Sequence, residues 1–360
     1  MRSLQETAIR VLPELRAVQV EQGLLMTPAM HWFFDTNYDL FETSIPPGFE
    51  RMSLRRAAWR LLSSNASVLE VPEPLWARFL PQNMTLVVAW RLGGLLRLRN
   101  RKARTYAIEN NSPSEALFGR SIPWPLDVLV RFALGAFMRI FFERVALGTP
   151  AAADSYATLP FFRRIEHSMI LGLPTPSLGA DEADADPNTA IFVGHLDARK
   201  GLPELMIAWS EVEQRLPSAS LVVVGAGPLR ESVEKWVAAR PGSRRYLGQL
   251  PHDRILSVVG QAAVVVAPSV RARRWREQVG LPIEEGLSMG RTIVTTSETG
   301  LADWLHQHGH SIIASDAPET DLSRALVDAL TYPIEPSSVL GSLPTRHGRL
   351  VADSWLHRAY

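Results

Sequence analysis

Two carboxylates separated by seven residues could bind a ligand rich in hydroxyl groups. They are Glu277 and Glu285, which begin and end the segment EQVGLPIEE. A carboxylate accepts two hydrogen bonds, and the vicinal hydroxyls of a sugar or a ribose offer two donors. On these residues alone a plainer explanation stays open, namely that Glu284 and Glu285 only complement the dipole of a helix.

The segment between the two carboxylates favours phosphate. Gly280 allows the backbone to approach a ligand closely, and Pro282 suits the first position of a helix. A helix start presents free N–H groups and the positive end of the helix dipole, and both favour an anion. We therefore expect this loop to follow a strand, Ala263–Ala267, and to open a helix at a ligand site.

Two other loops carry groups of the same kind. In the segment VGHLDARKG, Arg199 and Lys200 precede a predicted helix, where cations can neutralise a diphosphate. In the segment VGAGPL, Gly225 and Gly227 follow a β-branched run. Taken singly, the first loop is more simply a solvated turn, and the second is a tight strand-to-helix turn that needs glycine.

The elements that would position these loops alternate regularly in the second half of the chain. Apolar strands and amphipathic helices follow one another, which is typical of a parallel sheet covered by helices. The expected strands are Ala190–Val193, Leu221–Val224, Tyr246–Leu247, Ala263–Ala267, Thr292–Thr295 and Ser311–Ile313. The expected helices are Pro203–Leu216, Leu229–Ala239, Asp253–Gln261, Pro282–Met289, Leu301–His306 and Glu319–Tyr332. Ligands of such folds bind outside the carboxyl ends of the strands, where these loops begin.

The first half predicts a second α/β domain, although its first sixty residues show no clean period. Four strands and one long helix are expected there: Val68–Val71, Leu86–Ala89, Thr105–Ile108, Ala151–Tyr156 and the helix Leu126–Leu147. The helix is long enough for a bilayer, but charged residues such as Arg131 and Arg139 interrupt it. Each charge would cost about 2.5–3.5 kcal/mol near the bilayer centre, so we do not expect the helix to cross a membrane.

Length and composition predict two domains joined by a linker. The chain has 360 residues, 46% hydrophobic and 21% charged, whereas single cores stop growing near about 250–300 residues. The acidic, small-residue run 179–189 is the expected linker. It separates an N-terminal domain, 1–178, from a C-terminal domain, 190–335, and a tail, 336–360, for which packing back on the first domain is one hypothesis.

The same numbers exclude several kinds of site and partner. The chain has no cysteine, which excludes disulfides and thiolate metal sites. Its net charge of +1 gives no argument for a nucleic-acid partner. The first residues do not resemble a signal peptide, so we expect a cytoplasmic location.

Six motifs in order resemble the retaining glycosyltransferases of family 4, also called group 1. They are VGHLDARKG, LVVVGAGPL, RYLGQLP, APS, REQVGLPIEEGLSMG and IVTTSETG, and they cover roughly residues 190–315. The resemblance implies the GT-B fold, in which two Rossmann-like domains have parallel sheets facing a central cleft. It also implies retaining transfer of a sugar from a nucleoside-diphosphate sugar, bound in the second domain, to an acceptor bound in the first, without a metal or other cofactor.

The resemblance implies roles for single residues. Lys200 would bind the donor diphosphate, Glu277 would hold hydroxyls of the transferred sugar, and Glu285 would accept hydrogen bonds from the ribose diol. Further donor-binding positions would be His195, Arg199, Gly225, Gly227, Leu250, Gly280 and Leu281. The family usually has arginine at the position of His195. A histidine is mostly neutral at pH 7 unless an anion raises its pKa, and Arg199 could substitute for it.

Two other functions remain open. The histidine at position 195 and the poor resemblance of the first half favour a catalytically weak or inactive binding subunit with the same fold. A nucleotide-sugar epimerase is the other, although the paired carboxylates are placed for hydroxyl recognition. The sequence indicates neither the nucleotide nor the sugar. A glycan, a lipid carrier or a small natural product could each be the acceptor.

Acceptor binding is predicted from single residues of the first half. Glu109 and Asn110 follow an expected strand, and polar residues at strand carboxyl ends often face a ligand. His31 and Asp35 are further candidates, and a structural role is the alternative for each of the four.

Two clusters of charged or metal-ligating side chains have both a plain and a functional explanation. The basic tract 91–104 is either a solvated face or, with the arginine-bearing helix after it, a surface for peripheral contact with an anionic membrane. His306, His308 and His310 resemble a metal cluster, but they lack a neighbouring acid. We expect no metal there.

Overall fold

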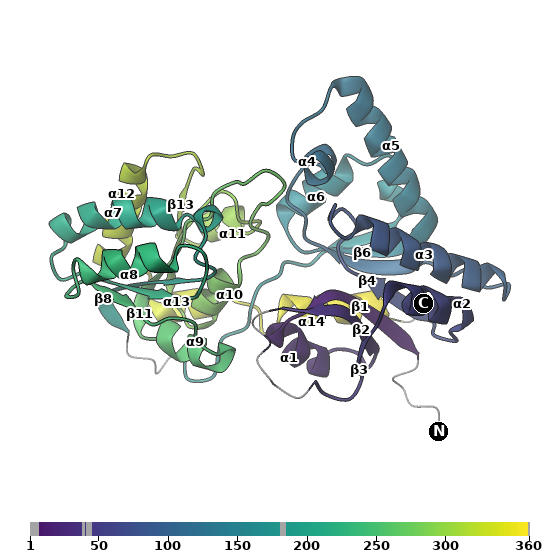
Figure 1. The fold of residues 1–360 in the computed structure, drawn as a ribbon, viewed down its shortest axis with the longest axis horizontal. Coiled ribbons are helices and arrows are strands. Elements are labelled where there is room, and N and C mark those ends of the chain that lie inside the picture. Colours follow the sequence, from purple (N-terminus) through teal and green to yellow (C-terminus); the bar gives the residue numbers. More distant parts are fainter. Residues whose placement is uncertain (1–6, 38–39, 41–44, 181–184, 359–360) are drawn as a thin grey trace. The chain divides into compact units, whose positions relative to one another are not determined.

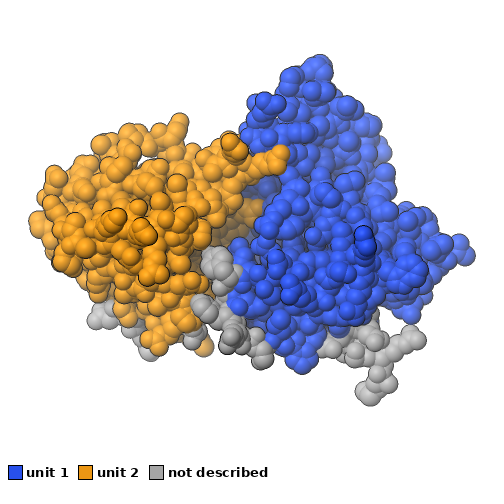
Figure 2. Space-filling model, viewed as in Figure 1, with its two compact units in different colours: residues 1–172, 348–360 blue, residues 173–347 orange. Residues whose placement is uncertain are grey.

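The protein folds as two compact units, each built on one parallel sheet with helices packed against it (Figure 1). The computed structural model describes residues 7–37, 40, 45–180 and 185–358. Unit 1 comprises residues 1–172 together with 348–360, and unit 2 comprises residues 173–347 (Figure 2).

Unit 2 contains a six-stranded parallel sheet in the order β10-β9-β8-β11-β12-β13. Its strands are β8 Asp186–Val193, β9 Ser220–Val224, β10 Arg244–Tyr246, β11 Ala262–Ala267, β12 Thr292–Thr296 and β13 Ser311–Ile313. Its helices are α7 Leu202–Arg215, α8 Arg230–Ala238, α9 His252–Val259, α10 Leu281–Ser288, α11 Ala302–Gln307, α12 Glu319–Thr331 and α13 Pro336–Gly341. The alternation predicted for this half is confirmed, because every expected strand and helix is present in its expected order.

One predicted boundary in this region is wrong. Residues 186–189 were assigned to the linker 179–189, but they form the first part of β8. Their polar composition is explained by exposure, since Asp186, Pro187 and Asn188 are exposed while the rest of the strand is buried. Thr189 Oγ1 donates to Asp186 Oδ2 at 2.7 Å and holds this polar end in place. Residues 181–184 of the expected linker lie outside the described residues.

Unit 1 contains a seven-stranded parallel sheet in the order β3-β2-β1-β4-β5-β6-β7. Its strands are β1 Ala8–Leu15, β2 Met30–Thr36, β3 Phe49–Arg51, β4 Val68–Val71, β5 Ala103–Ala107, β6 Phe142–Leu147 and β7 Glu166–Met169. Its helices are α1 Ala17–Leu25, α2 Leu54–Ser63, α3 Leu80–Leu95, α4 Pro113–Phe118, α5 Trp124–Phe141, α6 Pro150–Ala157 and α14 Gly348–His357. The second α/β domain is therefore confirmed.

Two elements predicted for this half are wrong in type, and a third is wrong at its end. The expected strand Leu86–Ala89 lies inside α3, and the expected strand Ala151–Tyr156 is α6. A short apolar run fits a strand and a buried helix equally well, and α6 also has the helix-start signal of Thr149, whose Oγ1 accepts from the N–H of Ala152 at 3.1 Å. The expected helix Leu126–Leu147 ends at Phe141, and its last residues form the buried strand β6.

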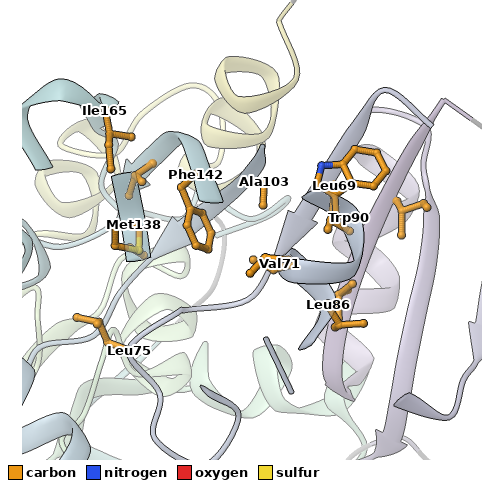
Figure 3. Close-up of a cluster of buried hydrophobic side chains, with 14 of the residues drawn as sticks. Leu69, Val71, Leu75, Leu86, Trp90, Ala103, Met138, Phe142 and Ile165 are labelled. Atoms are coloured by element: carbon orange, nitrogen blue, oxygen red, sulfur yellow. The ribbon is translucent and has the colours of Figure 1, made fainter. Parts of the chain in front are cut away.

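The core of unit 1 lies between the central strands and the helices α3 and α5 (Figure 3). Leu69 and Val71 on β4 pack with Trp90 on α3, and Phe142 at the start of β6 packs with Met138 on α5. Burial at spacings of three and four along α3, at Leu86, Trp90 and Gly93 among others, explains why this apolar run is helical.

The C-terminal helix α14 belongs to unit 1 and is attached by buried charges. Arg10 on β1 donates from Nε to Glu70 Oε2 at 3.0 Å and also pairs with Asp353 on α14. Burial would raise the pKa of Glu70, but Arg349 and Arg10 hold it well below its usual value. Breaking such a pair typically costs about 3–5 kcal/mol because it strands a buried charge, so these contacts fix the helix to the sheet.

Candidate functional site

The strand order of unit 2 reverses between β8 and β11, which are neighbours in the sheet although β9 and β10 separate them in the chain. Ligands of doubly wound sheets bind outside the carboxyl ends of the strands at this point. The loop after β8 carries Lys200 at the end of a 3-10 turn, Ala198–Lys200, and the loop after β11 carries Glu277. The two loops singled out in the sequence thus meet where the fold favours a ligand.

Lys200 and Glu277 form an ion pair at this edge. Lys200 Nζ lies 2.5 Å from Glu277 Oε2, and Ser269 Oγ donates to the same oxygen at 2.7 Å. The two charged side chains are only 18% and 14% exposed. A charge-assisted pair of this kind holds both groups in one geometry, and each can exchange its partner for a phosphate or a hydroxyl.

Trp275 packs against both cations of the first loop. Its ring centroid lies 4.5 Å from Arg199 Cζ and 4.9 Å from Lys200 Nζ. The backbones of the two loops also join, because the N–H of Val270 donates to Arg199 O at 3.0 Å. Gly201 allows this approach: its φ is +70°, and a Cβ there would lie 1.8 Å from Pro268 O.

Helix α10 begins beside the ion pair, as the sequence predicted. Gly280 is its N-cap with a φ of +95°, and the helix runs from Leu281 with Pro282 in its first turn. The preceding loop is tied to the loop after β12, since Thr299 Oγ1 donates to Val279 O at 2.7 Å. The start of α10 therefore has a fixed position after β11.

Glu285 is the most unusual carboxylate of this edge. It is 4% exposed, and neither of its oxygens accepts a hydrogen bond from the described part of the chain. The imidazole of His252 is nearby, with Nδ1 at 3.5 Å from Oε1. Burial, together with the negative charge of Glu284, raises the pKa of Glu285 to about 8. A buried carboxyl group without a donor costs free energy, which a ligand with hydroxyl donors would recover.

The glycines after β9 have a packing role. A Cβ on Gly225 would lie 1.8 Å from Gly194 O, and a Cβ on Gly227 would lie 2.5 Å from Leu196 O. The N–H of Gly225 donates to Gly248 O at 2.8 Å, so three strand-end loops touch through their backbones. This packing explains the glycines without a ligand, and it leaves open whether they also contact one.

The structure brings some of the predicted donor residues together and leaves others apart. Lys200 and Glu277 are in direct contact, whereas the charged neighbours of Glu285 are His252 and Glu284. His195 follows β8 and is half-buried, and Leu250 lies half-buried just before α9. Sequence reasoning missed Ser269, Trp275 and His252. The available signal concerned Trp275, an aromatic residue two positions before Glu277.

In unit 1 the predicted acceptor residues Glu109 and Asn110 lie beyond the end of β5 in a buried hydrogen-bond network. Glu109 accepts from the backbone N–H and the Nδ2 of Asn111 at 2.8 and 2.7 Å, and burial raises its pKa to about 7. Asn110 Oδ1 accepts from Thr149 Oγ1 at 2.7 Å. The residue at the centre of this network, Glu73, was missed in the sequence.

Glu73 follows β4, at the point where the strand order of unit 1 reverses between β1 and β4. Its carboxylate accepts from the backbone N–H groups of Leu75, Ile108 and Glu109 at 2.9, 2.7 and 3.0 Å, and from the hydroxyl of Tyr156. Burial raises its pKa. Its partners show that it orders the loops after β4 and β5.

His31 lies near the start of β2 and away from the carboxyl ends of the strands. Its ring stacks on Phe49 at 4.2 Å, and its Nε2 lies 2.7 Å from Arg10 Nη1. Burial and the charge of Arg10 lower its pKa to about 3. Asp35, farther along β2, is exposed and faces Arg51 at 3.6 Å. The surroundings of His31 favour a structural role.

The histidine cluster near residue 308 is held by ordinary contacts. His310 Nδ1 accepts from the N–H of Ile293 at 3.1 Å, and His308 stacks on Trp304 at 3.9 Å. Among the described residues, one group of three possible metal ligands lies within 4.8 Å of one another: Glu70, Asp353 and His357. Both of its carboxylates already pair with arginines, so neither group gives an argument for a metal.

Solved structures share the fold over nearly the whole chain. Anabaena Alr3699/HepE in complex with UDP and glucose is 11% identical with a TM-score of 0.61, covering 98% of this chain and 95% of that one. OtsA without ligand is 12% identical with a TM-score of 0.63, covering 98% and 99%. Two Rossmann-like units with parallel sheets, of 7 and 6 strands, place the chain in the GT-B class.

Sequence comparison finds a family match within unit 2. The family described as "Glycosyl transferases group 1" matches residues 187–332, which confirms over this region the resemblance seen in the motifs. The alpha-D-kanosaminyltransferase of Streptomyces kanamyceticus is 28% identical over 281 residues, 65% of this chain and 70% of the relative. The 2-deoxystreptamine glucosyltransferase of the same organism is 27% identical over 170 residues, and the match spans 47% of this chain but only 42% of that relative's length.

Proposed function

We propose that this protein is a retaining glycosyltransferase that takes its sugar from a nucleoside-diphosphate sugar bound at the carboxyl edge of unit 2. The observation that carries the proposal is the buried carboxylate of Glu285, which accepts no hydrogen bond from the described residues. A ribose diol would supply the two donors that it lacks. The family match over the same region supports this assignment.

The ion pair would change partners when the donor binds. Lys200 then binds the diphosphate, and the sugar hydroxyls replace Lys200 as the hydrogen-bond donors to Glu277. The leaving group is a nucleoside diphosphate, so the main catalytic task is to stabilise the negative charge that develops on it. Three groups are held in position before the reaction: Lys200, Arg199 and the start of α10. Preorganised groups of this kind stabilise the charge on a leaving group most effectively.

The relatives point to UDP as the first nucleotide to test. HepE is solved with UDP and glucose. The names of two relatives mention 2-deoxystreptamine and, in Mycobacterium tuberculosis, phosphatidyl-myo-inositol. For this chain we propose a donor with a diphosphate and a ribose. Its acceptor is a hydroxyl group on a glycan, a lipid carrier or a small natural product, bound by unit 1.

Calorimetric titration with UDP, GDP and ADP tests the donor site. We expect one of them to bind, and Lys200→Met to weaken its affinity by about tenfold or more through loss of one charge-assisted contact. Lys235→Met, on α8, makes the same chemical change away from the ion pair and should leave the affinity unchanged. Binding of no nucleotide, or equal binding by Lys200→Met, would refute the site.

Turnover separates the proposed enzyme from its two rivals. A glycosyltransferase releases the nucleoside diphosphate from the donor and forms a new glycoside whose anomeric configuration matches that of the donor. A binding subunit would bind the nucleotide without cleaving the donor, and an epimerase would convert the donor sugar without any acceptor. Either result would contradict the proposal even if nucleotide binding is confirmed.

A further inference from the structure

The first half of α5 exposes large apolar side chains to solvent. From the start of the helix at Trp124 to Phe132, the exposed ones are 48% to 78% accessible: Trp124, Leu126, Val128, Leu129 and Phe132. In Figure 1 this end of α5 projects beyond the sheet of unit 1. Exposed apolar side chains that gather on one element usually mark a contact surface.

The distribution of these side chains around the helix indicates what kind of partner fits. At 3.6 residues per turn they spread over roughly 200° of the circumference. A helix that packs against a protein shows an apolar stripe of about 100°. One groove on a protein would therefore leave part of this surface in water, whereas the interface of a lipid bilayer can surround it.

The second half of α5 is firmly anchored, so the exposure of the first half is a fixed feature. Leu134, Gly135 and Met138 are buried. A Cβ on Gly135 would lie 2.2 Å from Pro160 O, which shows how closely the helix meets the segment after α6. Phe132 also packs edge-on against Phe161, with ring centroids 5.5 Å apart.

Cations flank the exposed end. Arg120 precedes the helix, and Arg163 and Arg164 lie on the segment that packs against it; all three are exposed. The last two arginines help to line a hollow of about 380 Å³, together with residues 157–161. On the helix itself the acid Asp127 is paired with Arg131 at 2.6 Å. The charge around the apolar surface therefore complements anionic lipid headgroups.

Several cations of the basic tract 91–104, which the sequence suggested as a membrane contact together with the helix after it, form hydrogen bonds within unit 1. Arg97 donates to Leu62 O and Gly93 O, and Arg101 donates to Ser64 O at 3.0 Å. Lys102 donates to Arg139 O at 2.8 Å. These cations join α2, α3 and α5 to one another, so they serve the fold of unit 1.

We propose that the first half of α5 docks on an anionic lipid bilayer. Its apolar side chains enter the interface while Arg120, Arg163 and Arg164 contact lipid phosphates. The helix lies in the surface of the bilayer, since no helix of the described residues is long and apolar enough to cross it. Large apolar side chains that leave water stabilise the bound state, and anionic headgroups add attraction to the cations.

Vesicle flotation tests this docking surface directly. The protein should float with vesicles of phosphatidylcholine and phosphatidylglycerol, float less at high salt, and stay in solution with phosphatidylcholine alone. The double variant Trp124→Ser, Leu129→Ser should reduce the bound fraction at least tenfold. Trp59→Ser removes an equally exposed indole, 74% accessible, on α2 of the same unit and should bind like the parent.

Two further measurements separate docking from other causes. The double variant should keep the melting temperature and the nucleotide affinity of the parent, because the replaced side chains are exposed. Brominated lipids should quench the fluorescence of the parent more than that of Trp124→Phe. The proposal is overturned if the parent fails to float, if the double variant floats as well as the parent, or if light scattering shows a dimer that the double variant abolishes, which would make a second copy the occupant.

Discussion

Both units carry carboxylates of low exposure in the segments that follow their central strands, but the two units satisfy them differently. In unit 1, Glu73 accepts from three backbone N–H groups and a tyrosine hydroxyl, and Glu109 accepts twice from Asn111. In unit 2, Glu285 accepts no hydrogen bond from the described residues. Glu277 accepts hydrogen bonds from Lys200 and Ser269 where the strand order reverses. Burial raises the pKa of Glu73, Glu109 and Glu285 alike. A raised pKa alone therefore does not distinguish a ligand site, and the proposed donor site depends on the missing hydrogen-bond donors of Glu285.

The largest effect should come from Glu277→Gln in unit 2. The amide keeps the shape of the side chain but removes the negative charge that positions Lys200. It also removes one of the two oxygen acceptors for sugar hydroxyls. We expect transfer to fall by about 100-fold or more, since preorganised polar groups are worth this much in a transition state. The measurement is the release of nucleoside diphosphate in the presence of an acceptor.

The matched control for this variant is Glu335→Gln, which makes the same change at an exposed position of unit 2. It should transfer like the parent. If Glu277→Gln retains full transfer, the ion pair is only a structural contact between two loops. The difference drawn between the two units would then disappear.

In unit 1 the largest effect should be on stability, and Tyr156→Phe tests it. The variant removes the hydroxyl that donates to Glu73 and leaves the buried carboxyl with one donor fewer. We expect a loss of about 1–3 kcal/mol in the free energy of unfolding, which corresponds to roughly 2–4 °C in melting temperature for each kcal/mol. Nucleotide affinity should not change, because that site lies in unit 2.

Tyr332→Phe removes a hydroxyl from a tyrosine that is 81% exposed, and it should leave the melting temperature unchanged. Equal melting temperatures for Tyr156→Phe and the parent would show that the network around Glu73 contributes little. Glu73 would then have to be considered as a ligand-binding group like Glu285.

The same contrast explains what the sequence predicted. In unit 2 every strand, and every helix up to α12, was expected in order, because β-branched runs such as Val222–Val224 and periodic helices such as α7 carry clear local signals. Helix α13 was not expected: it lies in the run 336–360 that was assigned to the tail, and it belongs to unit 2. In unit 1 the local signal was ambiguous. The run Leu86–Ala89 is buried within a helix, and Phe142–Leu147 continues the apolar pattern of α5 into a strand. Only tertiary packing decides whether each of these apolar runs forms a helix or a strand.

The candidate site in unit 2 was predicted only in part. Lys200 and Glu277 were expected at one place, and the structure brings them into contact. The partner of Arg199 and Lys200, Trp275, was not expected, because a cation–π contact between two loops leaves no regular spacing in a sequence. Glu73 was missed for the same reason, since its donors come from three separate segments of unit 1.

At pH 8, Glu285→Gln should weaken nucleotide binding moderately and raise the stability of the unliganded protein. The ionised carboxylate is the better acceptor for a ribose diol, and its pKa in the unliganded protein is about 8. Nucleotide affinity of the parent should therefore rise by up to about tenfold per pH unit between pH 6 and pH 8 and level off above. In the variant, affinity should be about tenfold weaker at pH 8 and nearly independent of pH.

Stability changes in the other direction for this residue. The folded pKa is raised above the unfolded value, so the folded state binds the proton more tightly between about pH 4.5 and pH 8, and stability falls as pH rises through that range. Without nucleotide, Glu285→Gln should thus melt higher than the parent at pH 8 and like it at pH 4.5. A variant that melts lower than the parent at pH 8 would contradict an unsatisfied carboxylate.

The smallest effect is expected for Glu109→Gln, which separates the predicted acceptor contact from a structural role in unit 1. The amide oxygen can still accept from the N–H and Nδ2 of Asn111, so the loop should stay ordered. The pKa of about 7 gives the same sign as for Glu285 over a narrower range: the parent loses stability between about pH 4.5 and pH 7, and the variant does not. At pH 8 we expect the variant to be more stable than the parent, with an unchanged KM for the acceptor. Asp154→Asn, at an exposed acid of α6, is the matched control, and an acceptor KM raised tenfold by Glu109→Gln alone would place Glu109 at the acceptor instead.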